Sequence, residues 1–108
     1  MTEAQFKAFI VSALRKQSLR WKPINEIKKK ARICRGKYKC ELCGKLVSTK
    51  DGAVDHINPV VPITGFDGWD TFINNMFCEE DGLQFICNDC HDIKTKKENE
   101  QRKNFKAD

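Results

Sequence analysis

The chain carries two Cys-x-x-Cys pairs, CELC at residues 40–43 and CNDC at residues 87–90. This spacing lets two thiolates from one tight turn occupy adjacent corners of a tetrahedron. We therefore predict that Cys40, Cys43, Cys87 and Cys90 share one structural Zn(II). Reduced buried cysteines and a redox dithiol are the alternatives. The pairing argues against the first, and the lack of a strand-then-helix redox context weakens the second.

The distance between the two pairs shapes the expected fold. The 43 residues between Cys43 and Cys87 exceed the usual zinc-ribbon gap of roughly 15–20 residues, so this segment must loop out and return. A chain of 108 residues is long enough for one domain with a small core. Bound zinc would supply folding free energy that such a core lacks.

Hydrophobic periodicity predicts two helices before the first cysteine pair. A capping box at Thr2 and Gln5 begins the first helix, which we expect to end near Leu19. A second helical stretch follows Pro23, has its apolar residues on one side, and ends before Gly36.

Between the cysteine pairs, we expect residues 45–48 and 53–57 to form one β-hairpin. The Asp51-Gly52 pair between them favours the positive φ angles of a tight turn. The remaining predicted helices lie at about residues 67–78, with Asp67 as N-cap, and from Asp89 to about Gln101.

Charge is strongly segregated along the chain, whose formal net charge is +5. Residues 1–39 carry 12 basic and 2 acidic side chains, residues 40–92 carry 2 and 10, and residues 93–108 carry 6 and 3. Basic ends favour a polyanion partner, because contacts of Lys and Arg with phosphate release condensed counterions. An acidic centre suits a bound cation. For any one charge run, a solubilising surface is the alternative.

Membrane insertion and export are not expected. No stretch approaches the roughly 18 apolar residues that a membrane span needs. The start of the chain also lacks the basic-then-apolar order of a secretory signal. We therefore expect an intracellular protein with no membrane partner.

The two histidines of the chain occupy informative positions. His56 follows Asp55 at the end of the second predicted strand, and His91 follows Cys90. If the cysteines share one metal, these three side chains can converge. One imidazole could then abstract a proton from water, while the carboxylate and the other imidazole hold a divalent cation on a phosphate. The alternatives are a surface Asp-His pair and an additional zinc ligand.

Three sequence blocks together resemble HNH endonucleases of the zinc-knuckle type. The blocks are YKCELCG at residues 38–44, VDHINP at residues 54–59 and LQFICNDCHDIKT at residues 83–95. The resemblance, which covers residues 38–98, implies a ββα-metal fold that grips one catalytic divalent ion (Mg, Mn, Ni or Zn). It implies that His56 is the general base, and that Asp55 and His91 are the ligands of this ion.

The resemblance also implies an organisation and an activity. The expected α+β fold is a small zinc-stapled ββα-metal (HNH) domain with N-terminal helices and a C-terminal helix. Residues 1–37 would be a basic helical arm, residues 38–98 the nuclease domain with its inserted helix, and residues 99–108 a basic tail. The implied function is a metal-dependent DNA endonuclease that hydrolyses phosphodiester bonds and nicks, as a monomer or weak dimer. Similar stand-alone bacteriophage proteins imply a phage terminase as partner and the cytoplasm of the host cell as location.

Contacts with DNA should be mainly to phosphates, which position the backbone without reading bases. Each lysine taken singly could equally belong to a solvated helix face, so the prediction concerns the group. The predicted contacts are Lys28, Lys29, Lys30, Arg32, Arg35, Lys37, Lys39, Lys94, Lys96 and Lys97, with Arg102 and Lys103 beyond them.

One position departs from the family pattern. The middle asparagine of HNH proteins, just before the Leu-Gln pair, is replaced here by Gly82. Its role could fall to Asp81, to Asn74 or Asn75 in the inserted segment, or to no residue. A compensating residue from the insertion is our preferred interpretation. The alternative function is a non-catalytic zinc-knuckle DNA-binding or accessory module with a decayed active site.

Overall fold

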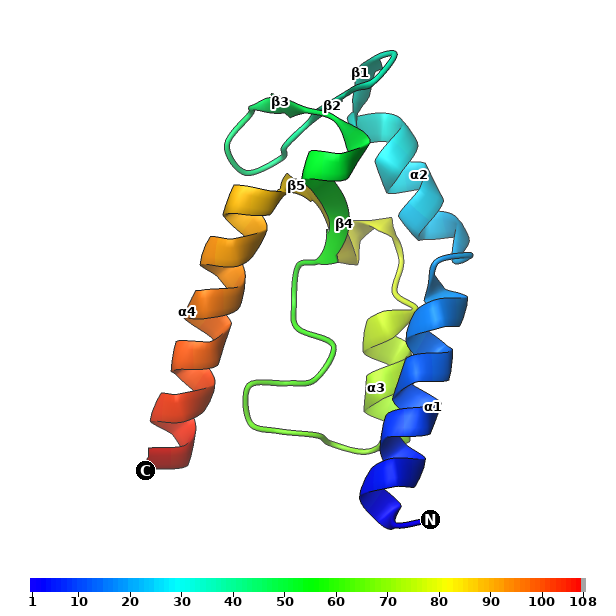
Figure 1. Cartoon of the computed structure of the whole chain (residues 1–108), viewed down its shortest axis with the longest axis vertical. Coiled ribbons are helices and arrows are strands. Elements are labelled where there is room, and N and C mark those ends of the chain that lie inside the picture. The colour runs from blue at the N-terminus through cyan, green and yellow to red at the C-terminus, as the bar shows by residue number, and fades with distance from the viewer. Residues whose placement is uncertain (108) are drawn as a thin grey trace.

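Residues 1–107, which this computed structural model describes, fold into four α-helices and two small antiparallel sheets (Figure 1). The helices are α1 (Glu3–Ser18), α2 (Lys22–Ala31), α3 (Trp69–Met76) and α4 (Asn88–Ala107). The strands are β1 (Arg32–Cys34), β2 (Lys37–Lys39), β3 (Leu46–Val47), β4 (Gly52–His56) and β5 (Leu83–Cys87). The predicted α+β class, with helices at both ends, is confirmed.

The first helix begins as its local sequence predicts, whereas the second ends early. The Gln5 N–H donates to the Thr2 hydroxyl (3.1 Å), and the Thr2 N–H donates to Gln5 Oε1 (3.0 Å), which completes the capping box of α1. α2 ends at Ala31, short of the predicted end before Gly36. The reason is that the residues after it pair as the β1–β2 hairpin.

The predicted hairpin of residues 45–48 and 53–57 is wrong in its pairing, although both segments contain strands. β3 pairs with β2, while β4 pairs with β5, and both pairs are antiparallel. Residues 49–51 form a short 3-10 helix in place of the hairpin turn. Gly52 opens β4, and a Cβ at this position would lie 2.6 Å from the ring Cζ of Phe85. This glycine therefore permits close packing between the strands.

The two later helices differ from the prediction at their ends. Gly68 is the N-cap of α3, so the prediction of Asp67 is wrong. α4 includes residues 99–107, which the sequence predicts as a tail. The Arg102 guanidinium donates to the Val61 carbonyl oxygen (2.7 Å) and anchors this part of the helix. Within residues 1–107, no helix has the length and apolar character needed to cross a membrane.

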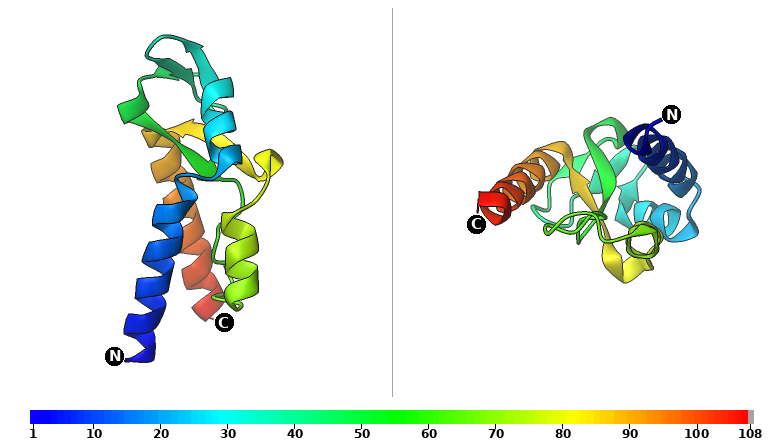
Figure 2. Two further views of the ribbon diagram at one scale, coloured as in Figure 1. Left: turned by 90° about the vertical axis from the view of Figure 1, so that its right-hand side faces the viewer. Right: turned by 90° about the horizontal axis from the view of Figure 1, so that it is seen from below.

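β5 is the centre of the core, since all five of its residues are buried. Ile27 and Ala31, on the apolar side of α2, belong to the same buried cluster, as their helical spacing predicts. Phe72 and Met76 of α3 are also buried. Figures 1 and 2 show α1 and α4 extending in the same direction away from the sheets, with α3 beside α1. β4 and β5 lie between α2 and α4, which both pack against these strands.

Candidate functional site

The four cysteines of the two pairs meet at one point. All their Sγ atoms lie within 4.8 Å of one another, with 3.7 Å between Cys40 and Cys90 and 3.8 Å between Cys43 and Cys87. A tetrahedron with zinc–sulfur bonds of about 2.3 Å places its sulfurs about 3.8 Å apart. The donor set therefore fits a structural metal such as zinc, as the spacing predicts.

Hydrogen bonds to the neighbouring turn and to β5 hold the first cysteine pair against the sheet. The Cys40 N–H donates to the Lys45 carbonyl oxygen (2.9 Å) and closes the turn after β2. Glu41 then joins this turn to β5. The Phe85 N–H donates to the Glu41 carboxylate (2.6 Å), and the Glu41 N–H donates to the Phe85 carbonyl oxygen (2.9 Å). The second pair spans the end of β5 and the first turn of α4, so a bound metal would join the sheet to this helix.

The thiols of the cluster differ in acidity because their surroundings differ. Burial alone would raise the pKa of Cys40, but backbone N–H groups, including that of Cys43, donate to its sulfur and lower the pKa to about 6. A hydrogen bond with the Cys87 sulfur, together with burial, raises the pKa of Cys90 to about 12. One thiolate therefore forms readily, whereas several together need the compensating charge of a cation.

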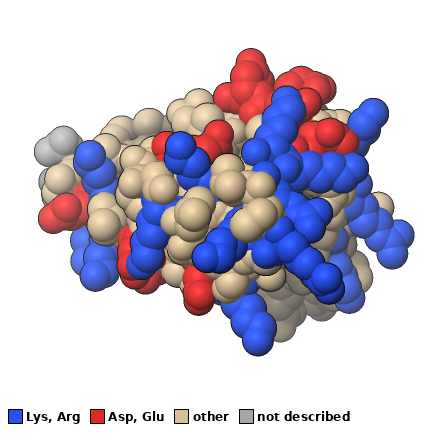
Figure 3. All heavy atoms as spheres, turned by 90° about the horizontal axis from the view of Figure 1, so that it is seen from above, with Lys and Arg blue, Asp and Glu red and all other residues tan. Residues whose placement is uncertain are grey.

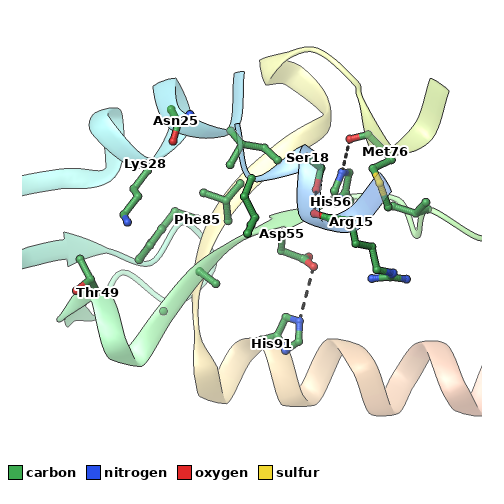
Figure 4. A pocket seen from close by; sticks show the side chains of 16 residues that line it. Arg15, Ser18, Asn25, Lys28, Thr49, Asp55, His56, Met76, Phe85 and His91 are labelled. Carbon is green, nitrogen blue, oxygen red and sulfur yellow. Dashed lines mark hydrogen bonds and ion pairs between the residues drawn. The ribbon is translucent and has the colours of Figure 1, made fainter. Parts of the chain in front are cut away.

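Asp55 on β4 and His91 on α4 point toward each other (Figure 4). Asp55 Oδ1 lies 3.9 Å from His91 Nε2, and the Asp55 side chain is only 15% exposed. The other carboxylate oxygen, Oδ2, lies 3.0 Å from Lys94 Nζ and accepts a hydrogen bond from the Gln84 amide (3.4 Å). The structure thus brings together the carboxylate and the imidazole that the family resemblance pairs.

His56 contacts a different part of the molecule. Its Nε2 lies 2.7 Å from the Met76 carbonyl oxygen at the end of α3 (Figure 4). A carbonyl oxygen can only accept, so Nε2 carries the proton and Nδ1 of the neutral ring keeps a free lone pair. The helix inserted between β4 and β5 therefore fixes both the orientation and the tautomer of this imidazole.

Two clefts meet at these side chains. The larger, of about 610 Å³, is lined by Asp55, His56 and His91 together with parts of α1 and α2. The second, of about 540 Å³, shares Asp55 and His56 and continues along α4. Arg15 of α1 lines both clefts, and Lys28 of α2 lines the larger one. These two cations, beside a carboxylate and two imidazoles, would favour the binding of a phosphate-containing ligand such as a nucleic-acid backbone.

Position 82 has little room for a side chain. A Cβ on Gly82 would lie 2.9 Å from Cys78 Sγ and 3.3 Å from Cys78 Cβ. The Cys78 side chain therefore occupies the space that a larger residue would need. Position 82 is a packing position in this chain.

Gly82→Asn is expected to lower the free energy of unfolding by about 1–3 kcal/mol, as overpacking usually does. The melting temperature of the zinc-loaded protein measures this effect. Cys78→Ala in the same chain should recover part of the loss, because it removes the nearest atom. An unchanged melting temperature for Gly82→Asn would contradict the tight contact.

None of the three proposed substitutes for the asparagine has a side chain hydrogen-bonded to His56 within residues 1–107. Asp81 and Asn74 are exposed. Asn75 instead donates to the Val60 carbonyl oxygen (3.1 Å). The partner of His56 does come from the insertion, but it is the backbone carbonyl of α3 described above.

Basic side chains are numerous on the face that carries β1–β3 and the end of α2 (Figure 3). Lys30 of this group pairs with Glu80 at 2.6 Å. Lys94 differs from the other predicted contacts, because its side chain is 18% exposed and its ammonium lies between two carboxylates. The predicted contacts that are exposed are Lys28, Lys29, Lys30, Arg32, Arg35, Lys37, Lys39, Lys96, Lys97 and Lys103.

Three contributors to the site were missed by sequence reasoning. Arg15 lies in the last turn of α1, where a basic residue ordinarily complements the helix dipole. Gln84 lies opposite Asp55 across the β4–β5 pair, so finding it required the correct strand pairing. The Met76 carbonyl is a backbone group and has no signal in the sequence.

Comparison with known proteins adds no family assignment. No family model, curated protein or solved structure matches the chain.

Proposed function

We propose that the protein is a metal-dependent DNA endonuclease of the HNH type, which hydrolyses phosphodiester bonds. β4, β5 and α4 would form its ββα-metal unit. The observation that carries the proposal is that Asp55 Oδ1 and His91 Nε2 lie 3.9 Å apart in a cleft that His56 also lines, near a four-cysteine cluster. A module that only bound DNA would need none of these three side chains in one cleft.

The Asp55–His91 pair would hold a divalent ion after a small closing of the two side chains. Two ligand bonds of about 2.1 Å at octahedral or tetrahedral angles place the donor atoms about 3.0–3.4 Å apart. Oδ1 and Nε2 lie 3.9 Å apart, so the ion would draw them together by less than about 1 Å. Mg, Mn, Ni and Zn all accept a carboxylate together with an imidazole. When bound, such an ion would polarise the phosphate and stabilise the leaving oxygen.

His56 is the general base in this proposal. Because its Nε2–H donates to the Met76 carbonyl oxygen, Nδ1 is available to take a proton from water. The same hydrogen bond would stabilise the imidazolium that results. The hydroxide equivalent formed in this way would attack phosphorus as the bond to the leaving strand breaks.

Basic side chains around the clefts would hold the DNA backbone. Arg15 and Lys28 line the clefts, and the exposed Lys and Arg residues of α2 and the β1–β2 hairpin extend the positive surface. Such contacts make affinity fall as salt rises. One site of this kind cuts one strand, so we propose nicking by a monomer. A role beside a phage terminase rests on the family resemblance.

A metal titration tests the proposal against a non-catalytic zinc-binding module. Zinc-loaded wild-type protein should bind one further, exchangeable Mn(II), and His91→Ala should lose this ion while keeping its zinc. Asp92→Ala, a change at an exposed position beside His91, is the matched control. Calorimetry and metal analysis provide the stoichiometry. A wild-type protein that holds zinc and no exchangeable ion would favour the binding module.

The binding module has one observation in its favour. The ammonium of Lys94 already lies 3.0 Å from Asp55 Oδ2, and this cation partly neutralises the proposed metal ligand. In a nuclease, a divalent ion at Oδ1 would therefore have to bind beside this ammonium.

A further inference from the structure

The two carboxylate oxygens of Asp55 have different neighbours. Oδ1 faces His91 Nε2 at 3.9 Å, whereas Oδ2 contacts Lys94 Nζ at 3.0 Å and the Gln84 amide at 3.4 Å. We propose that Lys94 is a positioning residue that holds Asp55 through Oδ2 and weakens divalent-ion binding at Oδ1 until DNA is bound. This inference rests on the proposed function and assigns a regulation to that site.

The Lys94 side chain lies within the site and is held there by its neighbours. Lys94 follows His91 by three residues on α4, so both side chains lie on one face of the helix. Glu98, one turn further on, lies 2.9 Å from the same ammonium, and the side chains of Lys94 and Glu98 are only 18% and 20% exposed. To contact DNA, the ammonium would have to leave two carboxylates. The geometry therefore favours a role toward Asp55 over a phosphate contact.

The charges around Asp55 couple the ion to DNA. Asp55, Glu98 and Lys94 together carry one net negative charge, which a divalent ion would turn into one net positive charge. The ammonium therefore opposes occupation of Oδ1 in the free protein. A DNA phosphate entering the cleft would add negative charge and offset this repulsion. Ion and DNA should then each raise the affinity of the protein for the other.

Lys94→Met tests the inference by Mn(II) titration of the zinc-loaded protein without DNA. We expect Mn(II) to bind about 3- to 10-fold more tightly than to the wild type, because one repelling charge is lost. Lys94→Arg keeps the charge and should restore the wild-type affinity. Lys106→Met, which removes a charge from the exposed end of α4, is the control.

A second titration measures the coupling itself. A duplex oligonucleotide should tighten Mn(II) binding less when position 94 is Met than when it is Lys. Both proteins carry His56→Ala in this titration, so that the duplex stays intact. Equal tightening in the two proteins would contradict the assigned regulation.

Glu98→Gln should have the opposite sign and weaken Mn(II) binding, because it removes a negative charge near the ion. If folded Lys94→Met binds Mn(II) as tightly as the wild type, or more weakly, the inference is overturned. The same holds if Lys94→Met lowers only the affinity for DNA, because Lys94 would then be a phosphate contact. If Lys94→Met does not fold, the Mn(II) affinity of Glu98→Gln is the deciding measurement. Mn(II) binding by Glu98→Gln that is unchanged or tighter than that of the wild type overturns the inference. A protein that binds no second ion, even when the duplex is present, would instead show that the proposed function itself fails.

Discussion

Replacing His56 by alanine is expected to lower the rate of plasmid nicking by at least about 100-fold, the usual contribution of a general base. The His56 ring is fixed by its hydrogen bond to the Met76 carbonyl oxygen, which leaves Nδ1 as the proton acceptor. Alanine supplies no acceptor in this place. The rate at which supercoiled plasmid becomes relaxed, with wild type and variant purified in parallel, measures the effect.

Controls separate the loss of a base from the loss of the fold. His56 is a ligand of neither ion in this account, so His56→Ala should keep its zinc, its second divalent ion and its affinity for DNA. Thr64→Ala changes an exposed loop residue and should nick at the wild-type rate. Equal nicking by His56→Ala and the wild type would show that water is activated by another group.

Removing the metal from the cysteine cluster is expected to unfold the protein. Cys87 is 3% exposed and ends the central strand β5, while Cys40 is fully buried beside it. Structural zinc contributes about 10–16 kcal/mol in small zinc domains, which is comparable to the total stability of about 5–15 kcal/mol of a typical domain. Chelation, or Cys87→Ser, should therefore abolish the helical circular dichroism signal and the cooperative melting transition.

Cys34→Ser is the matched control for this experiment. Cys34 is exposed and lies outside the cluster, so the variant should keep its zinc and melt like the wild type. Unchanged circular dichroism and melting after complete removal of the metal would show that the core is stable without it.

The cysteine cluster could be predicted from the sequence, whereas the strand pairing could not. Two Cys-x-x-Cys pairs constrain geometry by their spacing alone, wherever they lie in the chain. The partner of β4 is β5, on the far side of the inserted helix, while Asp51-Gly52 is a strong local signal for a hairpin. Gly52 in fact packs against Phe85. A sequence pattern does not distinguish a turn glycine from a glycine required by close contact.

The candidate site was predictable to a similar degree. The pairing of Asp55 with His91 could be predicted from chain order, because the four clustered cysteines join the last helix to the sheet. The tautomer of His56 depends on a backbone carbonyl, which no residue type marks. Lys94 belongs to a run of lysines that resembles a phosphate-binding face, and only the pairing with Asp55 and Glu98 distinguishes it from its neighbours.

The proposed activity is hydrolysis of phosphodiester bonds in DNA. A time course with supercoiled plasmid, wild-type protein and each of Mg, Mn, Ni and Zn measures this activity. We predict that relaxed circles accumulate with at least one of these metals, before any linear product. No relaxed circles with any of them, from protein that retains its zinc and binds DNA, would contradict the proposed activity and leave a DNA-binding module.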